Sequence, residues 1–214
     1  GNIYMKKLIW GIVVAALLWF YMFSPWTEGI GNFWVNMSIS ALVLTAISLY
    51  GLGPGTLREM PRVGIGECCI QAALGIVLAF VLWGVFFLGD YLSGIMFSFA
   101  GEQVDRVYGM KEGAPPAVIA LLLLFLIGPA EEFFWRGYVQ KTIGETVGKT
   151  PALFITTIIY ALVHIWSFNF MLIMAALVAG GFWGLIYRLK PSLLPALIVS
   201  HAIWDALVFI FLPI

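Results

Sequence analysis

The chain has 214 residues, of which 62% are hydrophobic and only 10% are charged. A soluble domain typically has about 25% charged residues, so this composition excludes a soluble globular protein and leaves no room for a separate soluble domain. The net charge of zero gives no indication of nucleic acid as a partner. We therefore expect residues 1–214 to form a single membrane-embedded domain in contact with the lipid bilayer.

The first apolar stretch begins close to the N-terminus. Met5 is followed by two lysines and resembles a natural start, so we expect residues 1–4 to be additions in front of it. The apolar run at 8–23 has no small-residue cleavage site after it. This pattern favours a retained first helix over a signal peptide.

Hydropathy predicts seven membrane-spanning helices, at residues 6–24, 33–52, 66–88, 116–140, 151–167, 169–188 and 192–212. Each is close to the ~20 residues that cross a bilayer core of about 30 Å. The predicted fold is therefore all-α, a polytopic membrane bundle of about seven transmembrane helices. The long connection at 90–113 is expected to carry an amphipathic helix on the outer surface.

Basic residues predict how the bundle is oriented. Nine of the eleven Lys and Arg residues fall on the side of the N-terminus, and only Arg106 and Lys111 fall on the other side. Because cytoplasmic loops are enriched in Lys and Arg, we predict that the N-terminus is cytoplasmic and the C-terminus external.

Two patterns concern packing and anchoring. Ala176, Gly180 and Gly184 recur every four residues in the sixth span, which predicts close helix packing inside the molecule. Tryptophans in the first two spans and their connection are expected to be interface anchors; they are Trp10, Trp19, Trp26 and Trp34.

Six ionisable residues lie within or at the ends of the predicted spans: Glu131, Glu132, Arg136, His164, His201 and Asp205. A charge at the centre of the hydrocarbon costs roughly 2.5–3.5 kcal/mol even on lenient scales, so such residues default to a functional role. Counting helix rise places Glu131 and the two histidines at a similar depth, in the half of the bilayer near the basic end. We therefore predict a shared polar cavity that opens toward the cytoplasm.

Spacing along each helix groups the six residues further. Residues four apart share a helix face, and the pairs with this spacing are Glu132–Arg136, Tyr160–His164 and His201–Asp205. A structural ion pair is the favoured interpretation of Glu132–Arg136 taken alone. Glu131 points about 100° away from Glu132 and keeps its oxygens for another partner. Tyr160, Trp135 and Trp204 neighbour this set and are candidates for the cavity wall or for packing.

Several chemistries fit these residues. A carboxylate and an imidazole can together remove a proton from water, while a second imidazole and a polar partner donate to a developing oxyanion; this set hydrolyses an amide. Glu131, His164 and His201 also offer the two-histidine, one-glutamate pattern of a zinc site with an open position. Relays of such residues also serve proton-coupled transporters, although the chain lacks the inverted repeats typical of that class.

Three motifs resemble one family. The segment EEFFWR at 131–136 matches an EExxxR motif, Tyr160–His164 resembles FxxxH, and His201–Asp205 resembles HxxxN/D. In this order they are similar to the CPBP family of intramembrane proteases, which includes the CAAX-processing prenyl-protein endopeptidase and the bacterial Abi proteins. The resemblance begins at about Pro115, and residues 115–212 would be the catalytic half.

The resemblance implies an intramembrane endopeptidase of the glutamate type in a prokaryotic inner membrane, acting on a membrane-associated peptide or protein. It implies no cofactor, with zinc on the residues named above as the alternative. The implied roles are catalytic carboxylate for Glu131, water activation for His164, oxyanion stabilisation for His201 and Asp205, and a structural pair for Glu132 and Arg136. Tyr160 stands where the family has Phe, and Asp205 stands where prenyl endopeptidases usually have Asn. Since an ionised Asp cannot donate a hydrogen bond, Asp205 is expected to orient His201 or to stay protonated.

Overall fold

Helices are the only regular elements in residues 2–214, the range that the computed structural model describes. Gly1, the first of the residues expected to precede the natural start, lies outside this range. The α-helices are α1 (Asn2–Phe23), α2 (Phe33–Glu59), α3 (Ile65–Met96), α4 (Ala100–Gly109), α5 (Pro116–Leu122), α6 (Gly128–Glu132), α7 (Lys141–Val147), α8 (Lys149–Leu162), α9 (Phe170–Leu189) and α10 (Leu194–Ala206). Short 3₁₀ turns are η1 (Met110–Gly113), η4 (Ile165–Ser167) and η5 (Pro191–Leu193), and π-helical segments are η2 (Leu123–Ile127), η3 (Phe133–Gln140) and η6 (Leu207–Phe211).

Seven of these helical stretches in residues 2–214 are long and apolar enough to cross a membrane. This confirms the predicted all-α bundle and its number of spans, and the protein is a multi-pass membrane protein. The second and third spans are longer than predicted. α2 continues to Glu59 through a break at Gly53, whose φ of 74° precedes Pro54, and α3 continues to Met96.

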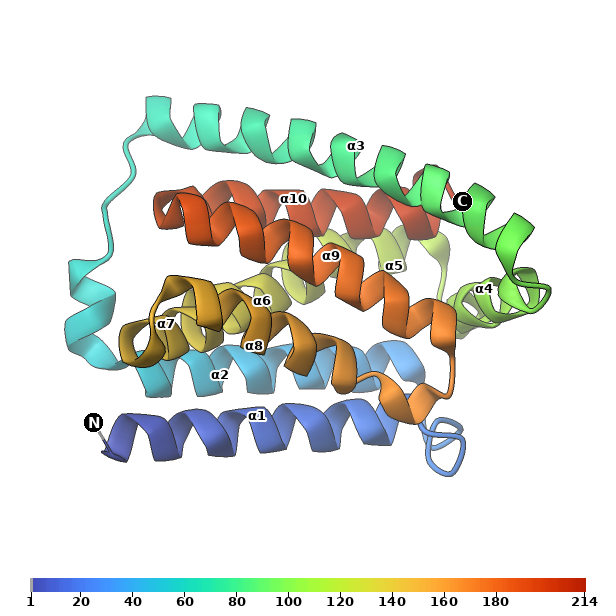
Figure 1. The fold of residues 1–214 in the computed structure, drawn as a ribbon, viewed down its shortest axis with the longest axis horizontal. Helices are drawn as coiled ribbons and strands as arrows, with labels where there is room; N and C mark the ends of the chain where they lie inside the picture. Colours follow the sequence, from blue (N-terminus) through green and yellow to red (C-terminus); the bar gives the residue numbers. More distant parts are fainter. Residues whose placement is uncertain (1) are drawn as a thin grey trace.

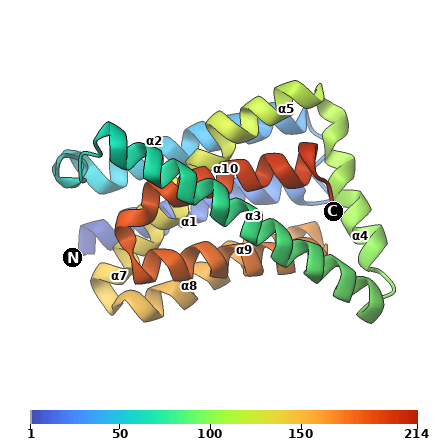
Figure 2. The ribbon, with the colours of Figure 1, turned by 90° about the horizontal axis from the view of Figure 1, so that it is seen from above.

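The helices form a bundle whose axes run mostly side by side (Figure 1). α1 and α2 form an antiparallel pair, α8 packs against α7 and α9, and α3 packs along α10. Figure 2 shows that α3 crosses the bundle obliquely and that α4 lies across the end opposite the N-terminus. The C-terminus lies near α4.

The predicted amphipathic helix of the third connection is α4, which is shorter than expected because residues 90–96 belong to α3. Gln103 fixes α4 to the start of α9. The carbonyl oxygen of Gln103 accepts from the side-chain amide of Asn169 at 2.8 Å, and its side-chain oxygen accepts from the backbone N–H of Met171 at 3.0 Å. α4 thus closes one end of the bundle.

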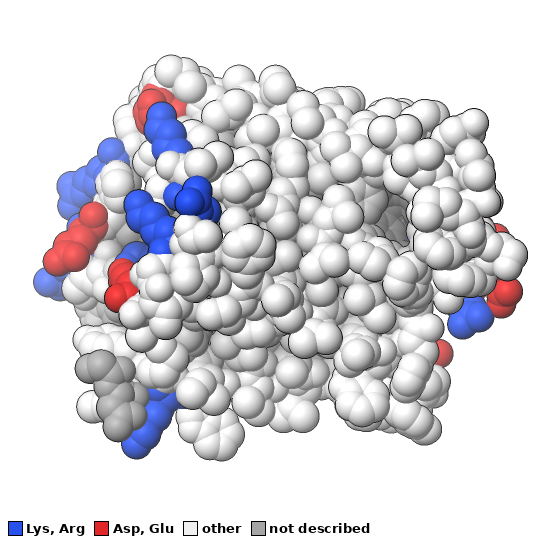
Figure 3. Space-filling model, in the orientation of Figure 1, with Lys and Arg blue, Asp and Glu red and all other residues white. Residues whose placement is uncertain are grey.

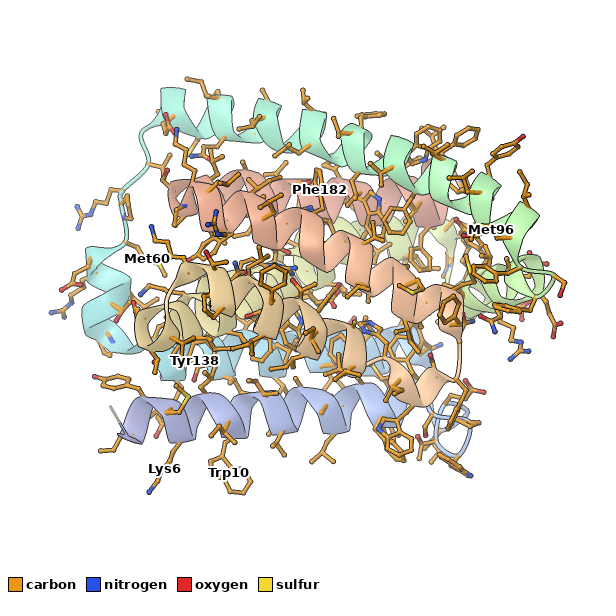
Figure 4. All side chains as sticks on the ribbon, viewed as in Figure 1. Lys6, Trp10, Met60, Met96, Tyr138 and Phe182 are labelled. Carbon is orange, nitrogen blue, oxygen red and sulfur yellow. The ribbon has the colours of Figure 1, made fainter. Side chains whose placement is uncertain are left out.

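Basic side chains gather at the other end. Lys and Arg are clustered on the left of Figure 3, where α1 begins, with few on the right. Lys6 and Met60 mark the basic end in Figure 4, and Met96 marks the end near α4. Arg136, which was counted with the basic end, is fully buried inside the bundle and does not belong to this surface.

Glycines bring α9 very close to its neighbours in the basic half of the bundle. A Cβ on Gly180 would lie 2.7 Å from Cδ1 of the Tyr160 ring. The carbonyl oxygen of Gly180 accepts from Nη2 of Arg136 at 2.7 Å, and that of Gly184 accepts from the side-chain amide of Gln140 at 2.9 Å. This confirms that the repeated small residues pack inside the molecule.

We expect Gly180→Ala to lower thermal stability, because the new methyl group would push Tyr160 out of place and such overpacking typically costs about 1–3 kcal/mol. Gly181→Ala is the matched control, since a Cβ there meets Thr157 only at 3.9 Å. Thermal unfolding of both variants in detergent measures the difference. Equal melting temperatures would show that the close approach at Gly180 is not a constraint.

Candidate active site

His201 lies at the centre of the ionisable residues. Its Nδ1 donates to Oε2 of Glu132 at 2.8 Å. Its Nε2 faces Oε2 of Glu131 at 3.7 Å and Oδ2 of Asp205 at 3.6 Å. All four side chains are buried. Two consecutive glutamates of α6 therefore hold opposite edges of one imidazole from α10.

The local backbone explains how both glutamates reach the same ring. α6 is only five residues long and lies between the π-helical segments η2 and η3. Wider π turns occur often at functional sites and change the direction of successive side chains, which α-helical spacing does not predict. Gly128 allows the approach to α10, since a Cβ there would lie 2.6 Å from Cα of Ala202.

Glu132 is shared between two partners. Nη1 of Arg136 donates to the same oxygen as His201, at 3.3 Å, and both members of this ion pair are fully buried. The predicted Glu132–Arg136 pair is therefore present, and His201 is a second partner of Glu132. Arg136 also lies over the Tyr160 ring, 5.1 Å from its centroid. A buried charge needs such partners, because losing one costs about 3–5 kcal/mol.

A residue that sequence reasoning missed supports His201 from the side. The indole of Trp183 stacks on the imidazole, with centroids 4.0 Å apart and planes 14° apart, and its Nε1 donates to Oγ of Ser200 at 3.0 Å. Trp183 lies three residues after Gly180, on the side of α9 that approaches the site. The glycine repeat was the only signal in the sequence that could have indicated this face.

His164 has both ring nitrogens engaged elsewhere. Its Nδ1 donates to the carbonyl oxygen of Tyr160 at 2.8 Å, and its Nε2 accepts from Nε1 of Trp19 at 3.2 Å. No hydrogen bond joins His164 to Glu131 among the described residues. Trp19 was expected at the membrane interface, but it is only 1% exposed and contacts the site, so that prediction is wrong. A polar partner deep in the bundle is a sufficient reason for its burial.

These groups face a cavity of about 330 Å³. Its polar lining includes Glu131, Tyr160, His164, His201 and Asp205, and Trp204 also contributes to the wall. Trp135, the third candidate for the wall, does not line it. This indole is fully buried behind Tyr160, with ring centroids 5.3 Å apart.

The cavity extends away from the basic end. Asp90 and Ser93 of α3, Tyr108 of α4 and Met174 of α9 line it, and Figure 3 shows a hollow between the positions of α3 and α9. The predicted opening toward the basic end is therefore wrong. Counting helix rise gives the depth of Glu131 but not the side on which the cavity opens. That side depends on the close packing of α9 at Gly180 and Gly184, on the basic side of the cavity.

Glu131, His201 and Asp205 form a compact set of possible ligands. Each offers one atom, and these atoms lie within 4.8 Å of one another. One water molecule can therefore sit about 2.8 Å from all three, the usual hydrogen-bond distance. An imidazole nitrogen and two carboxylate oxygens are also donors that zinc accepts, so the set fits this ion by type. The predicted zinc set contained His164 in place of Asp205; His164 is outside the compact set, and both of its nitrogens have other partners.

Comparison with protein families connects this geometry to a known group. A family model described as type II CAAX prenyl endopeptidase Rce1-like matches residues 113–207, the segment that carries every one of the six ionisable residues. Residues 113–207 are Rce1-like. This match confirms the resemblance to the CPBP intramembrane proteases and supports a CAAX-protease-like membrane endopeptidase, a hydrolase. Neither the curated proteins nor the solved structures gave a match.

Cysteines at the two ends test where the cavity opens. We expect Ser93→Cys, which lies in the cavity wall, to react with a membrane-impermeant thiol reagent in intact cells. Ser192→Cys, which is exposed at the basic end, should react only after permeabilisation. Cys68 and Cys69 are exposed free thiols and are replaced by serine in both variants. Labelling of both cysteines from one side of the membrane would contradict the placement of the cavity and the basic residues at opposite ends.

Proposed function

We propose that this protein is an intramembrane endopeptidase in which Glu131 activates a water molecule to hydrolyse a peptide bond. One observation carries the proposal. Glu131 and Asp205 are each 6% exposed, and their carboxylates line the cavity and make no hydrogen bond within residues 2–214. Buried carboxylates without donors are costly, so their retention beside His201 in the Rce1-like segment supports a site that binds a donor such as water.

The water between these groups would be oriented for attack. It donates one hydrogen to Glu131 and one to Asp205 and accepts from Nε2–H of His201, so one lone pair remains available for a carbonyl carbon. Glu131 removes the proton as the new C–O bond forms, which is general-base catalysis. Protonated Glu131 then delivers this proton to the leaving nitrogen as the C–N bond breaks, and the products are a carboxylic acid and an amine.

His201 would stabilise the oxyanion of the tetrahedral intermediate. Its Nδ1–H is fixed by Glu132 at 2.8 Å, so the ring is held with Nε2 toward the cavity. A proton on Nε2 can then be donated to the oxyanion, and a fixed donor costs no reorganisation during the reaction. Asp205, at 3.6 Å, keeps this edge of the ring in place. Glu132 and Trp183 act as positioning residues.

His164 has a conditional role in this proposal. The family resemblance implies that it helps to activate water, but its Nε2 accepts from Trp19 at 3.2 Å. It can contribute a nitrogen to the reaction only in a conformation in which Trp19 has released it. Until then the imidazole is part of the cavity wall.

A metal-dependent version of the same hydrolysis is the second candidate, because the three donors of the compact set fit a divalent cation. Glu131, His201 and Asp205 would hold the ion. When bound, zinc would polarise the peptide carbonyl and favour formation of hydroxide. The residues around the set would keep their roles, with Glu132 orienting His201.

We expect Glu131→Gln to lower peptidase activity by about 10²- to 10⁴-fold, because the amide has the shape of the carboxylate but cannot accept the proton. The measurement uses purified protein in lipid vesicles with a library of apolar peptides and reads the cleavage products by mass spectrometry. Glu28→Gln, at an exposed position before α2, is the matched control and should keep full activity.

Thermal unfolding of both variants separates chemistry from folding. A Glu131→Gln protein that melts like wild type and cleaves at the wild-type rate would exclude Glu131 as the base. Wild-type protein that cleaves none of the peptides, in lipid in which it is folded, would contradict the endopeptidase proposal itself.

A further inference from the structure

Carboxylates predominate in the wall of the cavity, where His201 is the one group to which the proposed mechanism gives a positive charge within residues 2–214. Its lining includes three carboxylates, Asp90, Glu131 and Asp205, and no Lys or Arg in the part of the chain that the structure describes. Lys111 is not part of the lining; its ammonium lies over the ring of Tyr108, 4.5 Å from the centroid. A substrate therefore meets an acidic surface, and the catalytic residues do not account for Asp90.

Asp90 lies between the catalytic residues and the α4 end of the cavity. On α3 it comes one turn after Phe86, whose ring contacts Trp204 with centroids 4.8 Å apart. Trp204 is next to Asp205 in α10, so Asp90 lies about 6 Å further along α3 than the level of the site. Its side chain is half-buried and borders the cavity.

Asp90 has no partner of opposite charge. No ion pair or hydrogen bond of its side chain is present within residues 2–214. Tyr108, the neighbouring polar group, cannot donate to it. The Tyr108 hydroxyl proton goes to the carbonyl oxygen of Val208 at 2.8 Å, and its oxygen accepts from the backbone N–H of Ile214 at 3.0 Å. Asp90 and Tyr108 line the same cavity; burial raises the pKa of Tyr108, the hydrogen bond from the backbone of Ile214 opposes this rise, and the negative charge of Asp90 adds to it.

We propose that Asp90 is a subsite for a cationic side chain of the substrate, Lys or Arg, in an otherwise apolar segment. This inference rests on the proposed function and specifies its substrate class. The carboxylates of Glu131 and Asp205 face the same cavity and make no hydrogen bond within residues 2–214, with Nε2 of His201 at 3.7 and 3.6 Å, so they add to the negative charge around a bound cation. A cation lowers the free energy of all three carboxylates, whereas an acidic residue or a free carboxyl terminus is repelled.

The rest of the lining fits such a segment. Apolar side chains of α9 and α4, including Met171, Met174, Val104 and Val107, surround the space beyond Asp90. They would bind the apolar residues that flank the cation, since burial of each CH₂ group contributes about 0.8 kcal/mol. The preferred scissile bond is therefore internal, with a basic residue on the α4 side of it.

Binding to the inactive Glu131→Gln protein tests this without relying on turnover. The probes are apolar peptides, acetylated and amidated at their ends, that differ only in Lys, Gln or Glu at one guest position moved along the sequence. Capping removes the terminal ammonium, so only the side chain supplies the cation. An uncapped Gln peptide shows whether a terminal ammonium can replace it. At the best position we expect Lys to bind about tenfold more tightly than Gln, and Glu more weakly than Gln.

Substitutions at Asp90 assign the preference to this residue. Asp90→Asn, made in the Glu131→Gln background, should bring the Lys and Gln peptides to equal affinity, and Asp90→Lys should favour Glu. Asp105→Asn is the matched control, because Asp105 is exposed on α4 and outside the cavity. It should leave the preference unchanged.

Two results would overturn the subsite: equal affinities for Lys, Gln and Glu at every guest position, or a Lys preference that survives Asp90→Asn. Cleavage by the otherwise unmodified protein is measured in parallel with the same peptides. A Lys preference in binding that depends on Asp90, without any cleavage, would support the subsite and contradict the peptidase. Cleavage without that preference would support the peptidase and contradict the subsite.

Discussion

The structure depends most on one buried carboxylate oxygen. Oε2 of Glu132 accepts from His201 at 2.8 Å and from Arg136 at 3.3 Å, and Arg136 in turn donates to the carbonyl oxygen of Gly180 at 2.7 Å. These direct contacts join α6, η3, α9 and α10. Because each member is charged or strongly polar and fully or almost fully buried, none can lose its partner without a cost of several kcal/mol. The ring of His201 is thereby fixed before any substrate binds.

This arrangement divides the bundle into a closed half and an open half. Toward the basic end, Gly180 and Gly184 let α9 touch its neighbours, and the cavity that reaches Glu131 does not extend between them. Toward α4 the helices diverge, and a cavity of about 330 Å³ reaches Glu131 and Asp205. The contacts in the closed half thus orient His201, while the open half gives a ligand access to Glu131 and Asp205. The carboxylates at the boundary keep free oxygens that a donor can use, which is the physical basis of the proposed hydrolysis.

The sequence predicted those features that depend on local pattern. Long apolar runs predicted seven spans, the spacing of Glu132 and Arg136 predicted their ion pair, and the glycine repeat predicted internal packing. It could not predict features that arise from contacts between distant segments. The π-helical turns around Glu131, the stacking of Trp183 on His201 and the bond from Trp19 to His164 are examples. The direction of the cavity was also predicted wrongly, because hydropathy gives the depth of a residue but not the divergence of helices.

The central claim is that Glu131, His201 and Asp205 together hold one water molecule. A crystal structure at a resolution that shows ordered water, with anomalous data collected at the zinc edge, tests it most directly. We predict a single oxygen-sized peak about 2.8 Å from all three side chains and no anomalous signal. An anomalous peak at that position would assign the site to a metal ion. Direct hydrogen bonds among the three groups, with no space for a ligand, would contradict the account.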